Sequence, residues 1–427
     1  MLAFHRPNSK LCATCLPGDR SVKPTSNTED IAALRLKRGE ERRLRAGHCW
    51  VFSNEIDTVT TPLKNFDPGQ PVLIESASGK PVGRGYVNPH SLIAARLISR
   101  DHHLPLAQRL IEERVRTALA LRARYYQEPF YRCVFGESDG LPGLVVDRFG
   151  DYLVAQVTTA GMERVLDSVI GALQSVLQPQ GILLRNDGAI RELEGLERYV
   201  ELVSGAVPEQ LEVRENGCRF MIDPRGGQKT GWFYDHRENR VCVARHAQGQ
   251  RVLDLFSYTG AWGVQAAVAG AAEVTCVDSS QAALELAGEN AELNGVDAGF
   301  ELTKGDAFDV LSHLRHAQRR FDIVVVNPPA FIKRRKDHKR GVEAYRRLNQ
   351  AAMQLLEPGG LLLSASCSHH LERSTLVEVI MRGARHIDRT AQLLEFGYQA
   401  PDHPMHPAIP ETAYLKAVLA RVLPGAW

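Results

Sequence analysis

The sequence lacks the long apolar segments that mark membrane and exported proteins. No stretch approaches the roughly 18 apolar residues that a membrane-spanning helix requires. The N-terminus, MLAFHRPNSK, has no apolar run of signal-peptide length. The eight cysteines mostly stand singly within apolar segments, a distribution that does not suit a disulfide-stabilised secreted domain. We expect a cytoplasmic protein that has no membrane partner.

The sequence also lacks an excess of charge of one sign and a complete zinc motif. Lys and Arg number 52 against 50 for Asp and Glu, so net charge indicates no particular class of partner. Cys12 and Cys15 form a single CxxC without the second ligand pair that a zinc site needs. They stand within residues 1–29, which are rich in Pro, Ser, Thr and Asn. We therefore predict a disordered tail over 1–29 and no metal.

Two small domains are predicted after this tail. Residues 30–103 hold short alternating segments, such as QPVLIESA and LIAARLIS, separated by turn signals, which is typical of a small β-barrel. Residues 104–204 combine strand-like segments with helical patterns over 106–126 and 162–177, which indicates an α+β domain.

Residues 205–427 are predicted to form the largest domain, with a Rossmann-like α/β fold. The domain opens on a hairpin that turns at Asn216-Gly217, a pair that accepts positive φ. From Arg251 onward, the apolar runs RVLDLF, EVTCVD, FDIVVVN and GLLLSAS each precede or follow a helical stretch. This alternation predicts parallel strands that are buried on both faces of one sheet.

The first turn of this α/β domain has the features of a nucleoside-binding site. RVLDLF leads through SYTGAWG into a helix of small residues, which puts backbone N–H groups at the carboxyl edge of the sheet. Gly260 allows the backbone to approach a ligand closely. Asp254, Asp278 and Asp306 stand on or after successive strands, Asp278 to bind ribose hydroxyls and Asp306 to read an adenine edge. Any one of them would be an ordinary helix cap, but three in register favour a ligand site.

The dinucleotide fingerprint GxGxxG is missing from this turn, where only GAWG stands. Without that phosphate-binding turn, NAD and a dehydrogenase reaction are disfavoured. S-adenosylmethionine has no phosphates but has a ribose, an adenine and a charged amino-acid end, which suits the acidic residues better. We predict S-adenosylmethionine as the cofactor and S-adenosylhomocysteine as its product.

Two polar side chains are expected to flank one cleft at the reacting end of this site. Asn327 follows FDIVVV and opens the sequence Asn-Pro-Pro, whose prolines rigidify a loop. Cys367 follows GLLLSAS, which we expect to form the strand beside FDIVVV.

A cysteine at this position has a chemical use. A thiolate that adds to C6 of a pyrimidine makes C5 nucleophilic towards a methyl donor. A free cysteine is more often a small buried hydrophobe. We assign that ordinary role to Cys133, Cys218, Cys242 and Cys276.

Two basic clusters indicate contact with a phosphate backbone. KRRKDHKR follows the proline loop and RLKRGEERRLR stands in the first domain, each with six basic residues. Most such runs are solvated faces, but one lies beside the predicted cleft and the other lies on a small barrel. From the first cluster we expect substrate contacts by Lys333, Arg334, Arg335 and Lys336.

Long strings of the sequence together resemble the ribosomal RNA large subunit methyltransferase I family, bacterial cytosine-C5 methyltransferases that act on 23S rRNA. LKRGEERRLRAGHCWVFSNEI is similar to the family's RNA-binding PUA domain, and GESDGLPGLVVDRFGD to its central α+β domain. GGQKTGWFYDHRENR, LDLFSYTGAWG, NPPAF, SASCSHHL and QAPDHPMHPAIPETAYLKA are similar to its methyltransferase domain. The resemblance extends from about residue 30 to the C-terminus.

The resemblance implies a set of cofactor-binding residues, to which we add the neighbouring positions of the predicted loops. They are Gln228, Lys229, Thr230, Phe233, Arg237, Asp254, Phe256, Ser257, Thr259, Gly260, Asp278, Ser279, Asp306, Ala307 and Asn327. The resemblance also implies that Cys367 is the nucleophile. We expect Asn327 to act with it, and Pro328 and Phe331 to position a base that is splayed out of its stack.

The chain departs from the family at Asn327, where the family has Asp-Pro-Pro. A carboxylate there would hydrogen-bond a protonated ring nitrogen, whereas an amide supplies no negative charge. Asn-Pro-Pro resembles methyltransferases of exocyclic amines, but in those an aromatic residue follows directly, whereas here Ala330 precedes Phe331. Those enzymes also need no cysteine on the neighbouring strand.

We predict a methyltransferase for C5 of a cytosine in large-subunit ribosomal RNA, as naked RNA or in an assembling particle, with a homodimer as a possible state. The alternatives are a methyltransferase for an exocyclic amine of an RNA base and a non-catalytic RNA-binding or assembly protein.

Overall fold

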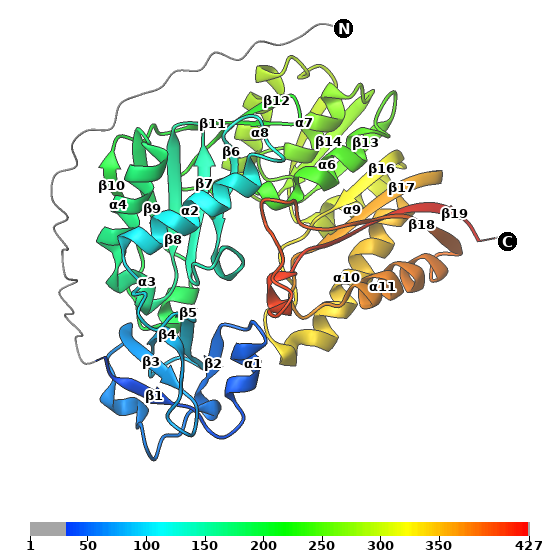
Figure 1. The fold of residues 1–427 in the computed structure, drawn as a ribbon. Helices are drawn as coiled ribbons and strands as arrows, with labels where there is room; N and C mark the ends of the chain where they lie inside the picture. The colour runs from blue at the N-terminus through cyan, green and yellow to red at the C-terminus, as the bar shows by residue number, and fades with distance from the viewer. Residues whose placement is uncertain (1–30, 426–427) are drawn as a thin grey trace, which may run out of the picture.

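A computed structural model describes residues 31–425 of the chain (Figure 1). The predicted tail over 1–29, with its CxxC, lies outside the described residues. These residues form sheets of five, five and seven strands and a separate two-stranded hairpin. Figure 1 shows the N-terminal sheet below the central sheet, with the seven-stranded sheet beside the central one.

The N-terminal sheet has the strand order β1-β3-β4-β5-β2. Alternate residues of its strands point into a small core, so that Val72 and Ile74 are completely buried while their neighbours are not. β1 runs parallel to β3, and the other neighbours are antiparallel. The elements are β1 (Ala33–Arg35), α1 (Glu41–Arg45), β2 (Trp50–Phe52), β3 (Gln70–Glu75), β4 (Pro81–Val87) and β5 (Ile93–Ser99).

The central sheet has the order β10-β9-β8-β7-β6 and carries its helices on one face. The helical pattern over 162–177 is split at Val165, whose φ of −110° and ψ of 25° leave the helical region. The elements are α2 (Gln108–Arg122), β6 (Phe130–Phe135), β7 (Leu144–Phe149), β8 (Tyr152–Val157), α3 (Ala160–Arg164), α4 (Leu166–Leu177), β9 (Gly181–Asn186), α5 (Ile190–Leu193) and β10 (Tyr199–Gly205).

The other face of the central sheet is fused to the methyl-donor half of the chain by a shared core. Phe149 and Val154 of the sheet pack in one cluster with Phe220 of the hairpin and with Trp232 and Val264. The hairpin consists of β11 (Leu211–Glu215) and β12 (Cys218–Ile222). It turns at Asn216 and Gly217, with φ of 54° and 80°. The predicted turn is therefore confirmed, since both residues adopt the left-handed conformation that this pair tolerates.

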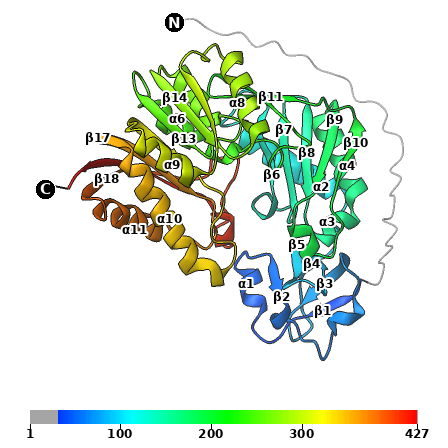
Figure 2. The same ribbon diagram turned by 180° about the vertical axis from the view of Figure 1, so that it is seen from behind.

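The seven-stranded sheet has the order β15-β14-β13-β16-β17-β19-β18. The first five of these strands are parallel, and β19 is antiparallel to both of its neighbours. Helices α6 to α8 pack on one face and α9 to α11 on the other (Figure 2). The strands are β13 (Arg251–Leu255), β14 (Glu273–Asp278), β15 (Phe300–Lys304), β16 (Phe321–Val326), β17 (Leu356–Ser366), β18 (Arg389–Gly397) and β19 (Lys416–Pro424). The helices are α6 (Arg237–Ala244), α7 (Ala261–Val268), α8 (Gln281–Leu293), α9 (Ala307–His316), α10 (His338–Gln354) and α11 (Arg373–Arg385).

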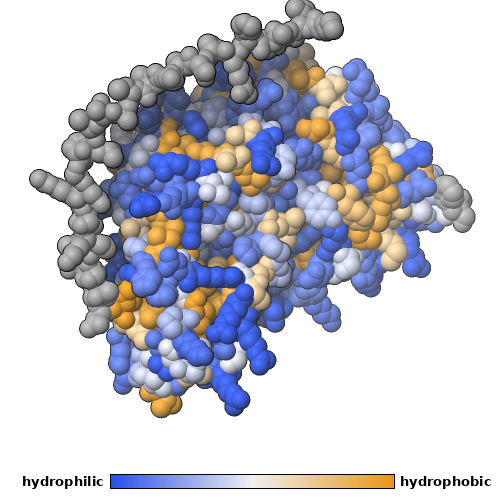
Figure 3. Space-filling model, in the orientation of Figure 1, coloured by the Kyte–Doolittle hydropathy of each residue, from blue (hydrophilic) through white to orange (hydrophobic). Residues whose placement is uncertain are grey.

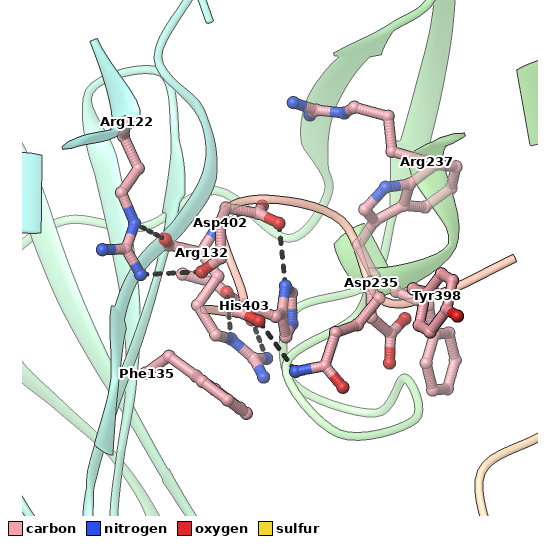
Figure 4. Close-up of polar contacts among 12 residues, drawn as sticks. Arg122, Arg132, Phe135, Asp235, Arg237, Tyr398, Asp402 and His403 are labelled. Carbon is pink, nitrogen blue, oxygen red and sulfur yellow. Dashed lines mark hydrogen bonds and ion pairs between the residues drawn. The ribbon is translucent and has the colours of Figure 1, made fainter. Parts of the chain in front are cut away.

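The segment between β18 and β19 leaves the sheet and reaches the central domain (Figure 4). Arg122 donates to the main-chain oxygen of Asp402 at 2.7 Å, and the N–H of Arg132 donates to the Asp402 carboxylate at 2.9 Å. The carboxylate also bonds His403 at 2.8 Å. Charge-assisted hydrogen bonds between buried groups therefore tie this segment to the central domain.

Candidate active site

A cavity of about 380 Å³ lies at the carboxyl ends of β13, β14, β16 and β17. This edge is where ligands bind in a parallel α/β sheet. The structure brings together there the predicted residues Gln228, Lys229, Phe233, Phe256, Ser257, Asp278, Ser279, Asn327, Pro328 and Cys367. The sequence reasoning did not single out the other lining residues Trp232, Asp235, His236, Arg240, Tyr258, Ala261, Trp262, Pro329 and Ala330. Several of these stand in the string GWFYDHRENR, which resembles the methyltransferase domain of the family but has no residue pattern that singles them out.

Cys367 and Asn327 reach this cavity from neighbouring strands. β16 and β17 are parallel with Val326 opposite Ser364, so the residues just beyond the two strands emerge at the same edge. Cys367 is half-buried. Burial raises the pKa of its thiol above the ordinary value, and Asp235 adds to this effect, whereas the ammonium groups of Lys229 and Lys416 oppose it.

The loop after β13 has an unusual backbone that turns its side chains towards the cavity. Phe256 and Tyr258 have φ of 61° and 49°, a conformation that is costly for residues with a Cβ and that clusters at functional sites. Asp278 accepts the Tyr258 N–H at 2.9 Å and thereby holds the loop against the end of β14. The Tyr258 hydroxyl accepts the N–H of Gln228 at 3.0 Å. The loop after β13 therefore positions the segment that carries Gln228 and Lys229.

Asp235 is a buried carboxylate at the wall of the cavity, with 3% of its surface exposed. Its Oδ2 accepts the Tyr414 hydroxyl at 2.5 Å. Burial alone would raise its pKa, but the ammonium charge of Lys229 and the hydrogen bond from Tyr414 help to hold the pKa of this group well below its ordinary range. Asp235 is therefore ionised at neutral pH.

Comparison with known proteins identifies the family. A profile of S-adenosylmethionine-dependent methyltransferases matches residues 192–421, and a profile of PUA-like domains matches residues 34–100. The ribosomal RNA large subunit methyltransferase I of Klebsiella pneumoniae strain 342 is 36% identical over 395 residues, which cover 91% of this chain and 98% of that protein. The protein of the same name from Aeromonas hydrophila is 37% identical over 397 residues, which cover 91% of this chain and 99% of that protein.

The chain belongs to the ribosomal RNA large subunit methyltransferase I family. Solved structures show the same fold. The crystal structure of SMU.776 in complex with SAH aligns with a TM-score of 0.79 at 23% identity, covering 92% of this chain and all of that one (100%). A structure described as a SAM-dependent methyltransferase from Streptococcus mutans aligns with a TM-score of 0.77 at 22% identity, covering 91% of this chain and 100% of that one. The predicted family, fold class and cofactor are confirmed, and the chain is an S-adenosylmethionine-dependent methyltransferase.

The cavity of this family member fits S-adenosylmethionine. The side-chain oxygens of Asp254, Ser257 and Thr259 include buried atoms that have no hydrogen-bond partner within residues 31–425, and Ser257 lines the cavity. Buried polar atoms without partners are rare in native proteins unless a ligand or water satisfies them. Asp278 lines the cavity with a carboxylate. Lys229 lines it with an ammonium group that lies 4.5 Å from the centroid of the Phe233 ring. The aromatic rings of the wall suit a planar base.

Two residues that we expected to bind the cofactor lie instead in contacts between domains. Thr230 is completely buried and donates to Asp147 of the central domain at 2.5 Å. Arg237 pairs with Glu215 at 3.3 Å and also donates to the Phe130 main-chain oxygen. Neither is among the residues that line the cavity. Their side chains are committed to protein partners, so the expected side-chain contacts of Thr230 and Arg237 with a ligand in the cavity are not what the structure shows.

Several other predicted cofactor residues lie behind or beside the cavity. Asp254 is completely buried and accepts the Gly263 N–H at 3.1 Å, and burial raises its pKa to about 7. Gly260 has a φ of 79°, and a Cβ there would lie 2.9 Å from the Cβ of Ala287, so this turn requires glycine. Asp306 is exposed and caps α9 by accepting the Phe308 N–H at 2.8 Å. The structure therefore shows Asp306 as a helix cap, the ordinary role that such an aspartate has. Thr259 and Ala307 are buried beside these turns.

The residues predicted to contact the substrate divide into two groups. Phe331 packs on Tyr345, with ring centroids 4.8 Å apart, and does not line the cavity, whereas Ala330 does. The basic run directly follows this loop and leads into α10. The side chains of Lys333, Arg334, Arg335 and Lys336 in this run are all exposed.

Within residues 31–425, no helix is long and apolar enough to cross a membrane. Over the same range, no three or more His, Cys, Asp or Glu side chains are grouped so as to hold a metal ion.

Proposed function

We propose that this chain methylates C5 of a cytosine in large-subunit ribosomal RNA, in the cytoplasm, through a covalent adduct with Cys367. The observation that carries the proposal is the Cys367 thiol at the wall of the donor cavity, which Asn327 and Asp278 also line. The names of the Klebsiella and Aeromonas relatives support ribosomal RNA as the substrate.

The cysteine solves a specific chemical difficulty of this reaction. C5 of cytosine is a poor nucleophile because its electrons are shared with the aromatic ring. When the Cys367 sulfur bonds to C6 and N3 gains a proton, C5 acquires enamine character and becomes nucleophilic. After methylation, a base or water removes the C5 proton, the C6–sulfur bond breaks to restore the C5–C6 double bond, and N3 releases its proton to solvent. The thiol is thereby regenerated for another turnover.

The Cys367 thiol must be ionised to add to C6. The groups around it have opposite effects on its pKa. Burial and Asp235 favour the protonated thiol, whereas Lys229 and Lys416 favour the thiolate. Lys416 lies on β19, directly beside β17, with Lys416 opposite Ser366. Its ammonium group donates to the main-chain oxygens of Ser368 and Tyr414 at 2.7 and 2.8 Å, which fixes the positive charge near the sulfur.

We assign the cofactor to one half of the cavity. Bound S-adenosylmethionine supplies a methyl group on a sulfonium, which a carbon nucleophile can take. The chain would orient it through Asp278 and Ser279 at the ribose, through Gln228, Lys229 and Ser257 at the polar ends, and through the rings of Phe233 and Phe256. Exclusion of water by these rings strengthens the electrostatic contacts.

The RNA would be held by basic groups on two domains. Figures 1 and 2 both show α1 of the N-terminal domain close to the start of α10. Arg42 and Arg45 of α1 are exposed, as are the basic side chains from Lys333 to Lys336. Figure 3 shows hydrophilic side chains projecting over the region of α1. Phosphates bound by both clusters would place an unstacked base at the cavity between them.

Asn327-Pro328-Pro329 supports a second candidate, a methyltransferase for an exocyclic amine. In that case Asn327 would bind the amine and Cys367 would have no chemical role. The structure weakens this candidate, because the small Ala330 lines the cavity while the ring of Phe331 lies against Tyr345. An aromatic side chain that stacks on the target base is therefore not supplied by this loop.

The test is nucleoside mass spectrometry of ribosomal RNA methylated by the purified chain. We expect 5-methylcytidine from the wild type and none from Cys367→Ala. Cys49→Ala is the matched control, because Cys49 is also half-buried but lies outside the cavity. A methylated exocyclic amine, or full methylation by Cys367→Ala, would reject the covalent route. No methylation by a wild type that still binds S-adenosylmethionine would favour the non-catalytic alternative.

A further inference from the structure

Asp235 has an unused hydrogen-bonding atom at the wall of the cavity. Its Oδ2 is engaged by Tyr414, but its Oδ1 is buried and has no partner among the residues that the structure describes. A buried carboxylate oxygen without a donor is costly, and most such atoms in native proteins are satisfied. Because Asp235 lines the cavity that also holds Cys367 and Asn327, a ligand in that cavity is the available source of a donor.

The position of this carboxylate is fixed from two directions. Its main-chain oxygen accepts the Ala400 N–H at 2.9 Å, and its side chain is held by Tyr414. Both partners belong to the segment between β18 and β19 that the central domain holds in place. Figure 4 shows Asp235 beside this segment, near Tyr398. A carboxylate fixed in this way is preorganised for a ligand and does not have to be ordered when the ligand binds.

We propose that Asp235 binds the amine edge of the target cytosine, with Oδ1 accepting a hydrogen bond from the 4-amino group or from the protonated N3. This inference rests on the proposed function, because it requires a cytosine in the cavity. It gives the site the negative charge that Asn327 does not supply. As Cys367 adds to C6, electron density moves to N3, which takes up a proton from solvent water. The carboxylate would then accept a hydrogen bond from this new N3–H, a contact that the unprotonated N3 of the ground state does not offer.

The same contact would select cytosine over uracil. Cytosine presents an amine donor at position 4, whereas uracil presents a carbonyl oxygen there, which the carboxylate would repel. A site that is built to accept from an amine rejects an analogue without it, because its buried polar group is then left unpaired. Asp235 would thus be both a catalytic residue and a determinant of specificity.

The lowered pKa of Asp235 makes it a weak base, so its carboxylate is suited to accept a hydrogen bond and not to remove a proton. The charge of Lys229 and the hydrogen bond from Tyr414 keep the carboxylate ionised, so it would accept a hydrogen bond from a protonated N3 without removing its proton. Lys229 is exposed at the cavity and remains free to bind the cofactor.

The test is Asp235→Asn, which is nearly isosteric and leaves an oxygen for Tyr414. We expect kcat for cytosine methylation to fall by about 10²-fold, with the affinity for S-adenosylhomocysteine unchanged within about twofold. We also expect less covalent complex with RNA that carries 5-fluorocytosine, and a smaller ratio of cytosine to uracil methylation. Tyr414→Phe keeps the carboxylate and should lose much less activity. Glu395→Gln on β18 removes an exposed carboxylate that pairs with Arg245, and is the control for charge alone.

Two results would overturn the inference while leaving the proposed function intact. If Asp235→Asn weakens S-adenosylhomocysteine binding by tenfold or more, in step with the loss of activity, then the carboxylate binds the cofactor. If the variant accumulates the covalent RNA complex, then Asp235 removes the C5 proton. In contrast, if the wild type itself forms no 5-methylcytidine, the proposed function fails first.

Discussion

The hydroxyl of Thr230 donates a 2.5 Å hydrogen bond to Asp147, and this bond links the central domain to the segment that carries Gln228 and Lys229. Asp147 is completely buried and also pairs with Arg132 at 2.7 Å. Lys229, the residue before Thr230, has a φ of 53°, so its backbone depends on support from its surroundings. The central domain therefore supports the backbone of the segment that carries Lys229 at the cavity wall, without lining the cavity itself.

Thr230→Val should weaken both the fold and cofactor binding. The valine leaves one oxygen of the buried Asp147 short of a donor, which we expect to lower the free energy of unfolding by about 1–3 kcal/mol. The Kd for S-adenosylhomocysteine should rise several-fold, because Lys229 loses its fixed position. Urea denaturation and calorimetry measure the two effects. Thr230→Ser keeps the hydroxyl and should retain wild-type binding; equal losses in both variants would contradict the role of this bond.

The reactivity of Cys367 should increase with pH through the alkaline range. Burial raises the pKa of the thiol above its ordinary value of about 8.5, so the thiolate fraction is small at neutral pH and grows as pH rises. Burial lowers the pKa of Lys416 to about 8, so its positive charge is present below that pH and is lost above it. Lys416→Met should therefore slow alkylation of Cys367 at pH 7 by about three- to tenfold and have less effect at pH 9. An unchanged profile of alkylation rate against pH would show that Lys416 does not influence the sulfur.

Asn327→Asp separates the two candidate reactions. In cytosine-C5 chemistry a carboxylate at this position would hydrogen-bond the N3–H that forms as the thiolate adds to C6, so we expect activity to be retained or raised by up to about tenfold. An exocyclic-amine methyltransferase would instead lose activity, because the amide oxygen and amino group of Asn327 would no longer both be available. Steady-state kinetics on the same RNA decide between these outcomes.

The basic run from Lys333 to Lys336 should contribute to RNA affinity by neutralising phosphates. Replacing all four residues with alanine should weaken RNA binding and reduce the slope of log K against log salt by roughly 0.7–0.9 for each phosphate that the variant no longer neutralises. Filter binding over a series of salt concentrations measures this slope, and S-adenosylhomocysteine affinity should stay unchanged. A wild-type slope in the fourfold variant would mean that these side chains are only a solvated face.

Local sequence patterns were sufficient to predict the strands of the large sheet and the position of Asn327 and Cys367 at one cavity. Apolar runs predicted the strands β13, β14 and β16, and the Asn216-Gly217 pair predicted the hairpin turn. Because Asn327 and Cys367 directly follow adjacent strands, their meeting at one cavity also followed from the order of the strands. Each of these inferences depends on neighbours in the chain or on the regular geometry of a parallel sheet.

Interactions between distant segments were not predictable in the same way. Asp235 acquires its environment from Tyr414 and Ala400, which are far away in sequence. Thr230 and Arg237 stand within a string that resembles cofactor-binding residues, yet their side chains turn to Asp147 and Glu215. Asp306 has the expected place after β15 but caps α9, which a local pattern does not distinguish from a ligand contact.

The most direct test of the central claim is covalent trapping on RNA that carries 5-fluorocytosine. The fluorine at C5 cannot leave as a proton, so the adduct of a C6-attacking thiol persists after methyl transfer. We predict that the wild type forms a denaturant-resistant complex only with S-adenosylmethionine present, and that peptide mass spectrometry finds the nucleotide on Cys367. A wild type that methylates unmodified RNA but forms no such complex, or forms it through another residue, would contradict the account.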